Sequence, residues 1–139
     1  MSLKGRILAI DYGEKRTGIA VSDPLQVMGY PLTTVATDEL MDFLKEYIST
    51  EDVRHIIIGH PELDDPQKSP LASQLEELRQ EIGKVFPELS VEFVDETLSS
   101  REAVQTLVQA GIKKRKRRKK ETVDTMSAAV ILQRYLGNI

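Results

Sequence analysis

The sequence has no cysteine among its 139 residues and only two histidines, His55 and His60. Without a thiol, the chain can form neither a disulfide scaffold nor a thiolate zinc site, and it has no cysteine nucleophile. Two histidines are too few for a histidine metal site, and a place in a strand explains His55 better than a ligand role does. Any metal site in this chain must therefore be built mainly from oxygen ligands.

Long apolar runs are also missing. The longest, such as Ile56–Ile58, fall far short of a membrane span, and the first residues show no signal-peptide pattern. Hydrophobic residues make up 40 % of the chain and charged residues 29 %, which is typical of a globular protein. The length is that of one domain, so we expect a single domain over residues 1–139, soluble and cytoplasmic.

The charges are unevenly distributed along the chain. There are 19 basic and 22 acidic residues, and eight of the basic ones form one unbroken run: Lys113, Lys114, Arg115, Lys116, Arg117, Arg118, Lys119 and Lys120. Taking these eight from the 19 leaves 11 basic residues against 22 acidic ones, so the rest of the chain carries −11. Adjacent cations repel one another, and phosphate is the usual anion that neutralises them. The run predicts a surface loop that binds nucleic acid, or, as the alternative, a loop that is only solvated.

Aromatic residues are scarce, at 5 % of the chain. Proteins that bind single strands commonly stack bases on aromatic side chains. We therefore expect few stacking platforms here, and recognition mainly of the backbone and shape of a nucleic acid.

The first third of the sequence predicts three short strands. Apolar residues indicate strands over 6–11, 17–22 and 30–35, with a hairpin turn over Gly13–Arg16 between the first two. The connections are too short for a parallel crossover, so the three strands should form an antiparallel meander.

The remaining sequence predicts helices that alternate with strands. A helical period covers 38–49, and the β-branched run 55–59 is typical of a central parallel strand. Further helices are predicted from Ser69-Pro70 to about Val85, from Ser99 to Gly111 and over 121–136, and a fifth strand over 91–94. The stripe expected to be buried on the second helix comprises Leu71, Leu75, Leu78, Ile82 and Val85. This order predicts an α/β fold with a mixed five-stranded sheet and helices on both faces.

Acidic residues stand where such a fold places its ligands. Asp11 ends the first predicted strand, Asp95 and Glu96 end the fifth, and Asp124 lies near the start of the last helix. Carboxylates that converge would repel unless cations bind between them, and hard oxygen ligands suit Mg²⁺ or Mn²⁺. Two such ions can hold both oxygens of an in-line phosphoryl displacement. Each acid also has a purely structural explanation, as a turn residue before glycine or as a partner of a helix dipole.

Small residues accompany the third acid. Ser127 and Ala128 follow Asp124 at i+3 and i+4 and should lie beside it on the helix surface. We expect them to leave space over the Asp124 carboxylate.

Four segments in a set order carry a resemblance to a known family. They are Ile10–Gly13 with Arg16–Asp23, then Ile58–Pro61, then Val94–Thr97, then Val123–Ala129 with Ile131–Gln133. Over nearly its whole length the chain resembles the YqgF (RuvX) family of Holliday junction resolvases, also described as pre-16S rRNA nucleases, which have an RNase H-like fold.

This resemblance implies a divalent-metal-dependent nuclease whose catalytic and metal-binding residues are Asp11, Glu96 and Asp124, with Mg²⁺ or Mn²⁺ as the cofactor. Its substrate would be structured nucleic acid, either a Holliday junction in DNA recombination or precursor 16S rRNA in ribosome biogenesis. Junction cleavage needs two sites that face opposite strands, so a junction substrate would imply a symmetric homodimer.

The chain departs from the family pattern at two positions. His60 stands where the family usually has leucine, and Thr97 where it usually has arginine. Without that arginine, Arg16 or Arg101 is expected to contact the substrate phosphates. The departures leave a non-catalytic nucleic-acid-binding or ribosome-maturation factor as the alternative function.

The identity of the third ligand stays open at this point. In an RNase H-like sheet the fourth strand lies beside the first, and adjacent strands are about 4.8 Å apart. An acid on the fifth strand must therefore reach roughly twice as far, which Glu96 can do better than Asp95. Glu62, which follows the fourth strand, is the alternative ligand.

Overall fold

The computed structural model describes residues 4–61, 70–96 and 120–138, with side chains of the last helix described from Thr125 onward. Its elements are β1 (Arg6–Asp11), β2 (Arg16–Ser22), β3 (Gly29–Ala36), a 3-10 turn (Thr37–Glu39), α1 (Leu40–Thr50), β4 (Val53–His60), α2 (Ala72–Val85), β5 (Ser90–Asp95) and α5 (Lys120–Tyr135). No helix in this described part of the chain is long and apolar enough to cross a membrane.

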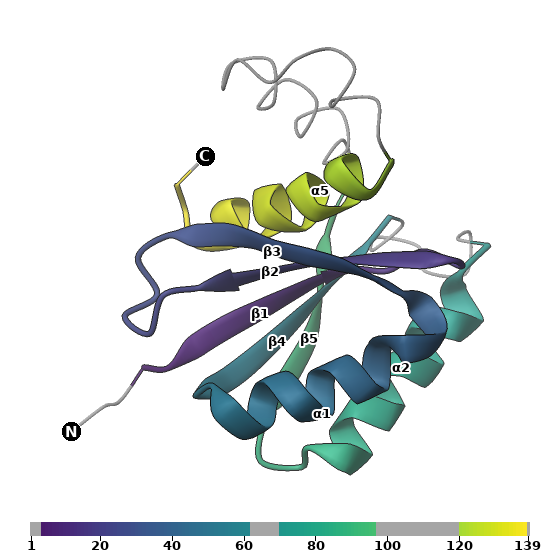
Figure 1. Ribbon diagram of the computed structural model, residues 1–139, viewed down its shortest axis with the longest axis horizontal. Helices are drawn as coiled ribbons and strands as arrows, with labels where there is room; N and C mark the ends of the chain where they lie inside the picture. The colour runs from purple at the N-terminus through teal and green to yellow at the C-terminus, as the bar shows by residue number, and fades with distance from the viewer. Residues whose placement is uncertain (1–3, 62–69, 97–119, 139) are drawn as a thin grey trace.

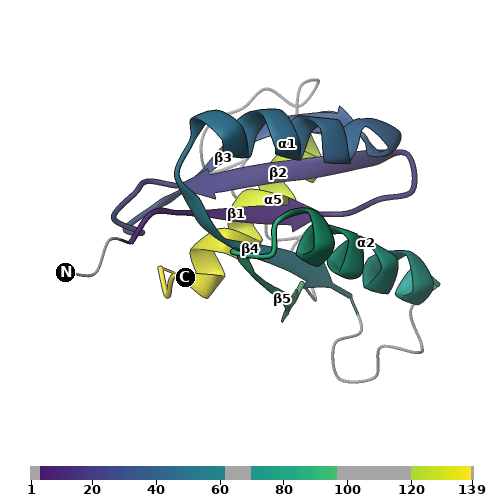
Figure 2. The same cartoon turned by 90° about the horizontal axis from the view of Figure 1, so that it is seen from below.

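The strands form one five-stranded sheet in the order β3-β2-β1-β4-β5. β1, β2 and β3 are antiparallel neighbours, whereas β4 runs parallel to β1 and β5 parallel to β4. Helix α5 covers one face of the sheet, and α1 and α2 cover the other (Figure 1). Seen from below, α1 lies on the β3 side and α2 on the β5 side of that second face (Figure 2). The predicted mixed sheet with an antiparallel meander is confirmed.

Two predicted details of the helices are wrong. Helix α2 begins at Ala72, with Leu71 as its N-cap, and so starts after the proline that was expected in its first turn. Val85, expected in the buried stripe, is 39 % exposed, and Phe86, the C-cap residue that follows it, is buried in the core instead. The stripe that is buried consists of Leu75, Leu78 and Ile82.

The other helices match to within a few residues where they are described. Helix α5 begins at Lys120, so this last residue of the basic run is helical and not part of a loop. The rest of the run, Ser69 and the helix predicted from Ser99 to Gly111 lie outside the described residues.

The two faces of the sheet have different cores. On the face of α1 and α2, large side chains interlock, among them Leu8, Ile10, Ile56 and Ile58. On the face of α5 the sheet and helix contribute small residues: Ala9, Ala20, Ala128 and Ala129. Small residues let a helix approach a sheet closely. With both faces buried, the open positions for chemistry are at the ends of the strands.

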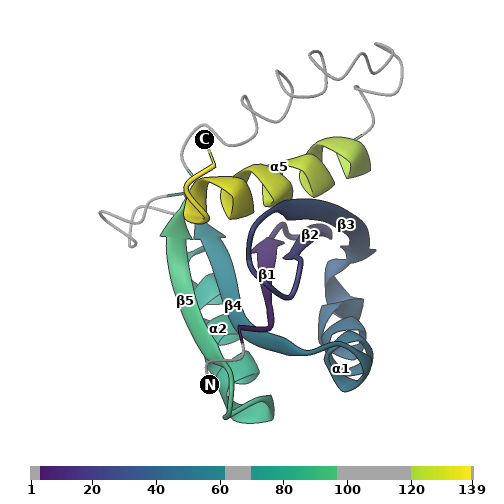
Figure 3. The ribbon, with the colours of Figure 1, turned by 90° about the vertical axis from the view of Figure 1, so that its left-hand side faces the viewer.

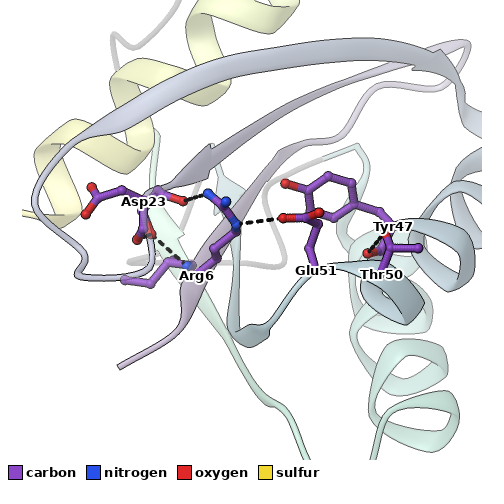
Figure 4. Close-up of polar contacts among 7 residues, drawn as sticks. Arg6, Asp23, Tyr47, Thr50 and Glu51 are labelled. Atoms are coloured by element: carbon purple, nitrogen blue, oxygen red, sulfur yellow. Dashed lines mark hydrogen bonds and ion pairs between the residues drawn. The ribbon is translucent and has the colours of Figure 1, made fainter. Parts of the chain in front are cut away.

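Hydrogen bonds and an ion pair connect the chain segments at the end of the sheet where β1 begins. Arg6 donates through Nε to Oε1 of Glu51 at 3.1 Å, just after α1, and through a terminal nitrogen to the Ser22 carbonyl at 2.9 Å (Figure 4). The Asp23 carboxylate accepts the N–H groups of Met28 and Val27 at 2.8 and 3.0 Å. These backbone hydrogen bonds, that of Met28 first, lower the pKa of Asp23. These contacts have a structural role. The candidate acids lie at the opposite end of the sheet, where β1 ends.

Candidate active site

Asp11 and Glu96 meet at the carboxyl edge of the sheet. Asp11 is the last residue of β1, and Glu96 follows β5 directly. The N–H of Glu96 donates to the carbonyl of His60 at 3.2 Å and extends the pairing of β4 and β5 by one step. The side chain of Glu96 is hydrogen-bonded to that of Asp11, although β4 separates their two strands.

Glu96 spans this distance by passing over Gly59. A Cβ atom built on Gly59 would lie 2.6 Å from Oε2 of Glu96 and 3.1 Å from its Cβ. The same atom would lie 2.7 Å from Cδ1 of Ile131 on α5. Contacts this short do not occur between real side chains, so any residue larger than glycine would occupy the path of Glu96. Sequence reasoning missed Gly59; the available signal was an isolated glycine at the end of an apolar strand, which often marks a close approach.

Strand alternation explains why Glu96, and not Asp95, faces Asp11. Ala9 and Ile57 point toward α5, so Asp11 and Gly59, two residues further along, lie on the same face. In β5, Val94 packs on the α5 side and Phe93 on the opposite side. Continuing that alternation puts Glu96 with Asp11 and puts Asp95, which is exposed, on the other face.

Burial is the main influence on the charge of Glu96. Loss of water around the carboxyl raises its pKa above the ordinary value, and the nearby Asp95 charge acts in the same direction. The hydrogen bond from Asp11 and the proximity of His60 act in the opposite direction and do not cancel the effect. While no cation is bound, the raised pKa means that the carboxyl of Glu96 holds its proton more strongly than a freely solvated glutamic acid does.

This pair fits a divalent cation. Its donors are carboxylate oxygens only, they face each other closely enough to hydrogen-bond, and their like charges are poorly solvated. A hard cation such as Mg²⁺ or Mn²⁺ binds such oxygen ligands and would compensate their negative charge. Within the part of the chain that the structure describes, no third acidic or histidine side chain joins them.

The third predicted acid, Asp124, belongs to α5, which covers the face to which Asp11 and Glu96 point (Figure 3). Its side chain lies outside the described residues. Ser127 and Ala128 are fully buried, and Ala128 packs in the core between α5 and the sheet. The space predicted over the Asp124 carboxylate lies outside the described residues.

The other predicted residues divide into two groups. Arg16, the first residue of β2, stands at the same edge of the sheet as Asp11 and, by alternation with Ala20, on the α5 face. The hairpin turn between them is pinned by Thr37, whose hydroxyl donates to the Gly13 carbonyl at 2.6 Å. Outside the described residues lie Glu62, Thr97, Arg101 and the run from Lys113 to Lys119.

A mixed sheet of this order, with an acid at the end of the first strand meeting an acid just after the fifth, places the chain among the RNase H-like nucleases. The family model RuvX, described as "Holliday junction resolvase", matches residues 5–138, and the chain belongs to this family. Nucleases of the RNase H-like type generally use divalent metal ions, and their substrates are nucleic acids.

Curated relatives agree with this family. A protein of Porphyromonas gingivalis is 46 % identical over 96 % of this chain and 97 % of its own length, and one of Bacteroides thetaiotaomicron is 49 % identical over 94 % and 95 %. Both carry the name "Putative pre-16S rRNA nuclease". Among solved structures, Pelota of Archaeoglobus fulgidus matches 89 % of this chain and 33 % of its own, with 11 % identity and a TM-score of 0.48.

Proposed function

We propose that this chain is a single-domain nuclease that hydrolyses phosphodiester bonds in structured nucleic acid, with Mg²⁺ or Mn²⁺ held by Asp11, Glu96 and Asp124. The observation that carries the proposal is the contact between Asp11 and Glu96, made across β4 over a glycine. A fold gains nothing from burying two carboxyl groups against each other, because their repulsion and desolvation oppose folding. A cation-binding role explains the arrangement.

The names of the family and of its members suggest two substrates, a Holliday junction and precursor 16S rRNA. Both are structured, and both would place the enzyme in the cytoplasm. For a junction, two copies would have to act on opposite strands, so we propose a homodimer for that substrate only. Precursor rRNA requires a single site.

Each residue of the site has a defined task in this mechanism. A bound divalent ion supplies an activated water and neutralises charge on the phosphate. Asp11 and Glu96 would hold the ion, which would compensate the charge that burial makes unfavourable on Glu96. Gly59 keeps the path of Glu96 open. Arg16 and the basic run from Lys113 to Lys120 hold the phosphates that flank the cleaved bond.

The test is cleavage by purified protein of a four-way junction, a duplex and a precursor 16S rRNA fragment, each with Mg²⁺ or Mn²⁺. We expect Asp11→Asn and Glu96→Gln to abolish cleavage while the circular dichroism spectrum stays that of the wild type. Asp95→Asn is the matched control, because Asp95 is adjacent but exposed on the other face, and it should retain cleavage.

Other outcomes decide between the alternatives. Cleavage by Asp11→Asn at the wild-type rate would refute the metal site, and loss of cleavage in Glu62→Gln but not in Glu96→Gln would assign the ligand to Glu62. Tight binding without cleavage by the wild type would favour the non-catalytic binding factor, for which the basic run is the supporting feature.

A further inference from the structure

A cavity of about 660 Å³ lies between α2 and β5. Its lining includes His60, Ala72, Glu76, Arg79, Glu92 and Phe93. Cavities of this size hold small organic molecules. The cavity is on the side of the sheet that α2 covers, whereas Asp11 and Glu96 point to the α5 side.

One wall of the cavity is a flat aromatic and cationic surface. The Cζ atom of Arg79 lies 5.8 Å from the centre of the Phe93 ring. The imidazole of His60 meets the same ring edge-on, with centroids 5.2 Å apart and an interplanar angle of 85°. Aromatic rings and guanidinium planes are the surfaces on which unstacked bases of nucleic acids stack.

The charges around the cavity favour a base over a phosphate. The Glu92 side chain turns to the other face of the sheet, where its carboxylate lies 3.4 Å from Nε2 of His55. Glu76 is therefore the carboxylate that faces the cavity, and Arg79 donates to it through Nε at 3.2 Å and through a terminal nitrogen. With this guanidinium already paired, the described lining residues offer no unpaired cation to a phosphate. The amino and imino N–H groups of a base, by contrast, are suitable donors to a carboxylate.

His60 connects the cavity with the acid pair. Its buried side chain lines the cavity, and its carbonyl accepts the N–H of Glu96 at 3.2 Å. The cavity and the acid pair thus share the carboxyl end of β4 on opposite faces of the sheet, and a strand that reaches both has to pass around β5, the last strand of the sheet. A base paired in a duplex cannot enter the cavity without unpairing.

We propose that this cavity binds one unpaired nucleobase of the strand held at the acid pair, stacked on Phe93 and Arg79. The proposal rests on the proposed function, because it uses the acid pair as the place where the strand is held. It assigns to the enzyme a preference for substrates with a single-stranded segment beside the cleaved bond. The low aromatic content predicted that the protein recognises mainly the backbone and shape of a nucleic acid. The proposal adds recognition of one base to this.

The experiment measures binding in EDTA, where cleavage is absent, to end-labelled single strands and fully paired duplexes of DNA and RNA. Phe93→Leu keeps an apolar side chain without its flat ring, and Phe86→Leu is the matched control, since Phe86 lies in the same core but not in the cavity. Ala72→Trp fills the cavity from α2, with Ser73→Trp, exposed on the next residue, as its control.

We expect Phe93→Leu and Ala72→Trp to weaken binding to single strands at least tenfold and to change binding to duplexes less than twofold. A 2-aminopurine in the single strand should be quenched by the wild type and by Phe86→Leu, and much less by Phe93→Leu. The stronger of the DNA and RNA effects identifies the source of the base. Wild-type behaviour of both cavity variants, or equal losses for single strands and duplexes, would overturn the proposal.

The result is separable from the proposed function. If the protein cleaves the substrates and both cavity variants bind single strands as the wild type does, the base-binding role of the cavity is refuted and the nuclease function stands. If the protein does not cleave but the cavity variants selectively lose single-strand binding, the nuclease function is refuted and the base-binding role of the cavity stands.

Discussion

At the scale of residues, the contact between Asp11 and Glu96 depends on the absence of a side chain at Gly59. Asp11 and Glu96 belong to strands separated by β4, and they touch because Gly59 presents only hydrogen toward α5. Glu96 is also one carbon longer than Asp95 and lies on the correct face. The contact requires the longer side chain of glutamate, its position on the α5 face and a glycine in the intervening strand.

Gly59→Ala tests this arrangement. The new methyl group would lie 2.6 Å from Oε2 of Glu96, so the carboxyl must move, and we expect cleavage to fall at least tenfold. Because Ile131 is also crowded, we expect a stability loss of about 1–3 kcal/mol. Gly83→Ala is the control: nothing lies within 4 Å of its added Cβ, and it should stabilise α2 by about 0.5–1 kcal/mol. Rates and urea unfolding measure both effects, and full activity of Gly59→Ala would contradict the account.

The buried carboxyl also predicts a pH dependence of stability without metal. The pKa of Glu96 is higher in the folded than in the unfolded chain, so the stability linked to its protonated form is complete below the unfolded pKa and is lost as pH rises through the folded pKa. Wild-type protein in EDTA should therefore lose stability relative to Glu96→Gln from about pH 4 upward. Melting temperatures between pH 4 and 8 measure this. A constant difference across that range would refute it, and Mg²⁺ should restore the wild type at pH 8.

At the scale of elements, the docking of α5 decides where Asp124 is carried. Gly29 in β3 lies against this helix, and a Cβ atom there would be 2.8 Å from Cγ of Leu132. The Gly29 N–H donates to Oε1 of Gln133 at 3.1 Å, and the hydroxyls of Thr34 and Thr125 are in contact. Helix α5 is thus seated on β3 at several points along its length.

Gly29→Ala should lift α5 from the sheet. We expect a loss of about 1–3 kcal/mol from the crowding of Leu132, and a fall in cleavage because Asp124 moves with the helix. Leu132→Ala alone should cost about 2–5 kcal/mol through the cavity it leaves. In the double variant each change relieves the other, so the total should be smaller than the sum by about 0.5–3 kcal/mol. Additive losses in urea unfolding would show that the two residues do not press on each other.

At the scale of the whole molecule, an acidic body must bind an anionic polymer. The chain carries −3 in total and −11 without the basic run, so the run is the main electrostatic attraction for nucleic acid. The structure places Lys120, the last residue of the run, at the start of the helix that bears Asp124. Nucleic acid held by the run would therefore lie near the end of α5 that carries Asp124.

Replacing Lys113–Lys119 with Ser and Gly, while keeping Lys120 for α5, tests this role. Each phosphate contact on duplex DNA steepens the log–log salt dependence of binding by about 0.9, so about six contacts give a slope near −5. The replacement should flatten that slope and weaken binding to all nucleic acids about equally, because phosphate contacts carry no sequence information. An unchanged affinity and slope would identify the run as a solvated loop only.

The sequence by itself determined the elements and the candidate acids. Period-2 and period-3.6 patterns in short apolar segments depend on local geometry, so the strands ending at Asp11 and Asp95 and the helix bearing Asp124 were predicted to within a few residues. Helix ends were less certain, as at Ala72, because the start of a helix depends on contacts beyond its own residues.

Only the tertiary structure decided which acids meet. Strand order puts β4 between Asp11 and Glu96, side-chain parity removes Asp95, and Gly59 opens the path between the pair. None of these facts is local, since each depends on how strands distant in sequence align side by side. The same is true of the cavity at Phe93 and Arg79, whose lining comes from β4, α2 and β5. Local periodicity specifies the parts of this protein, whereas the alignment of the parts creates its site.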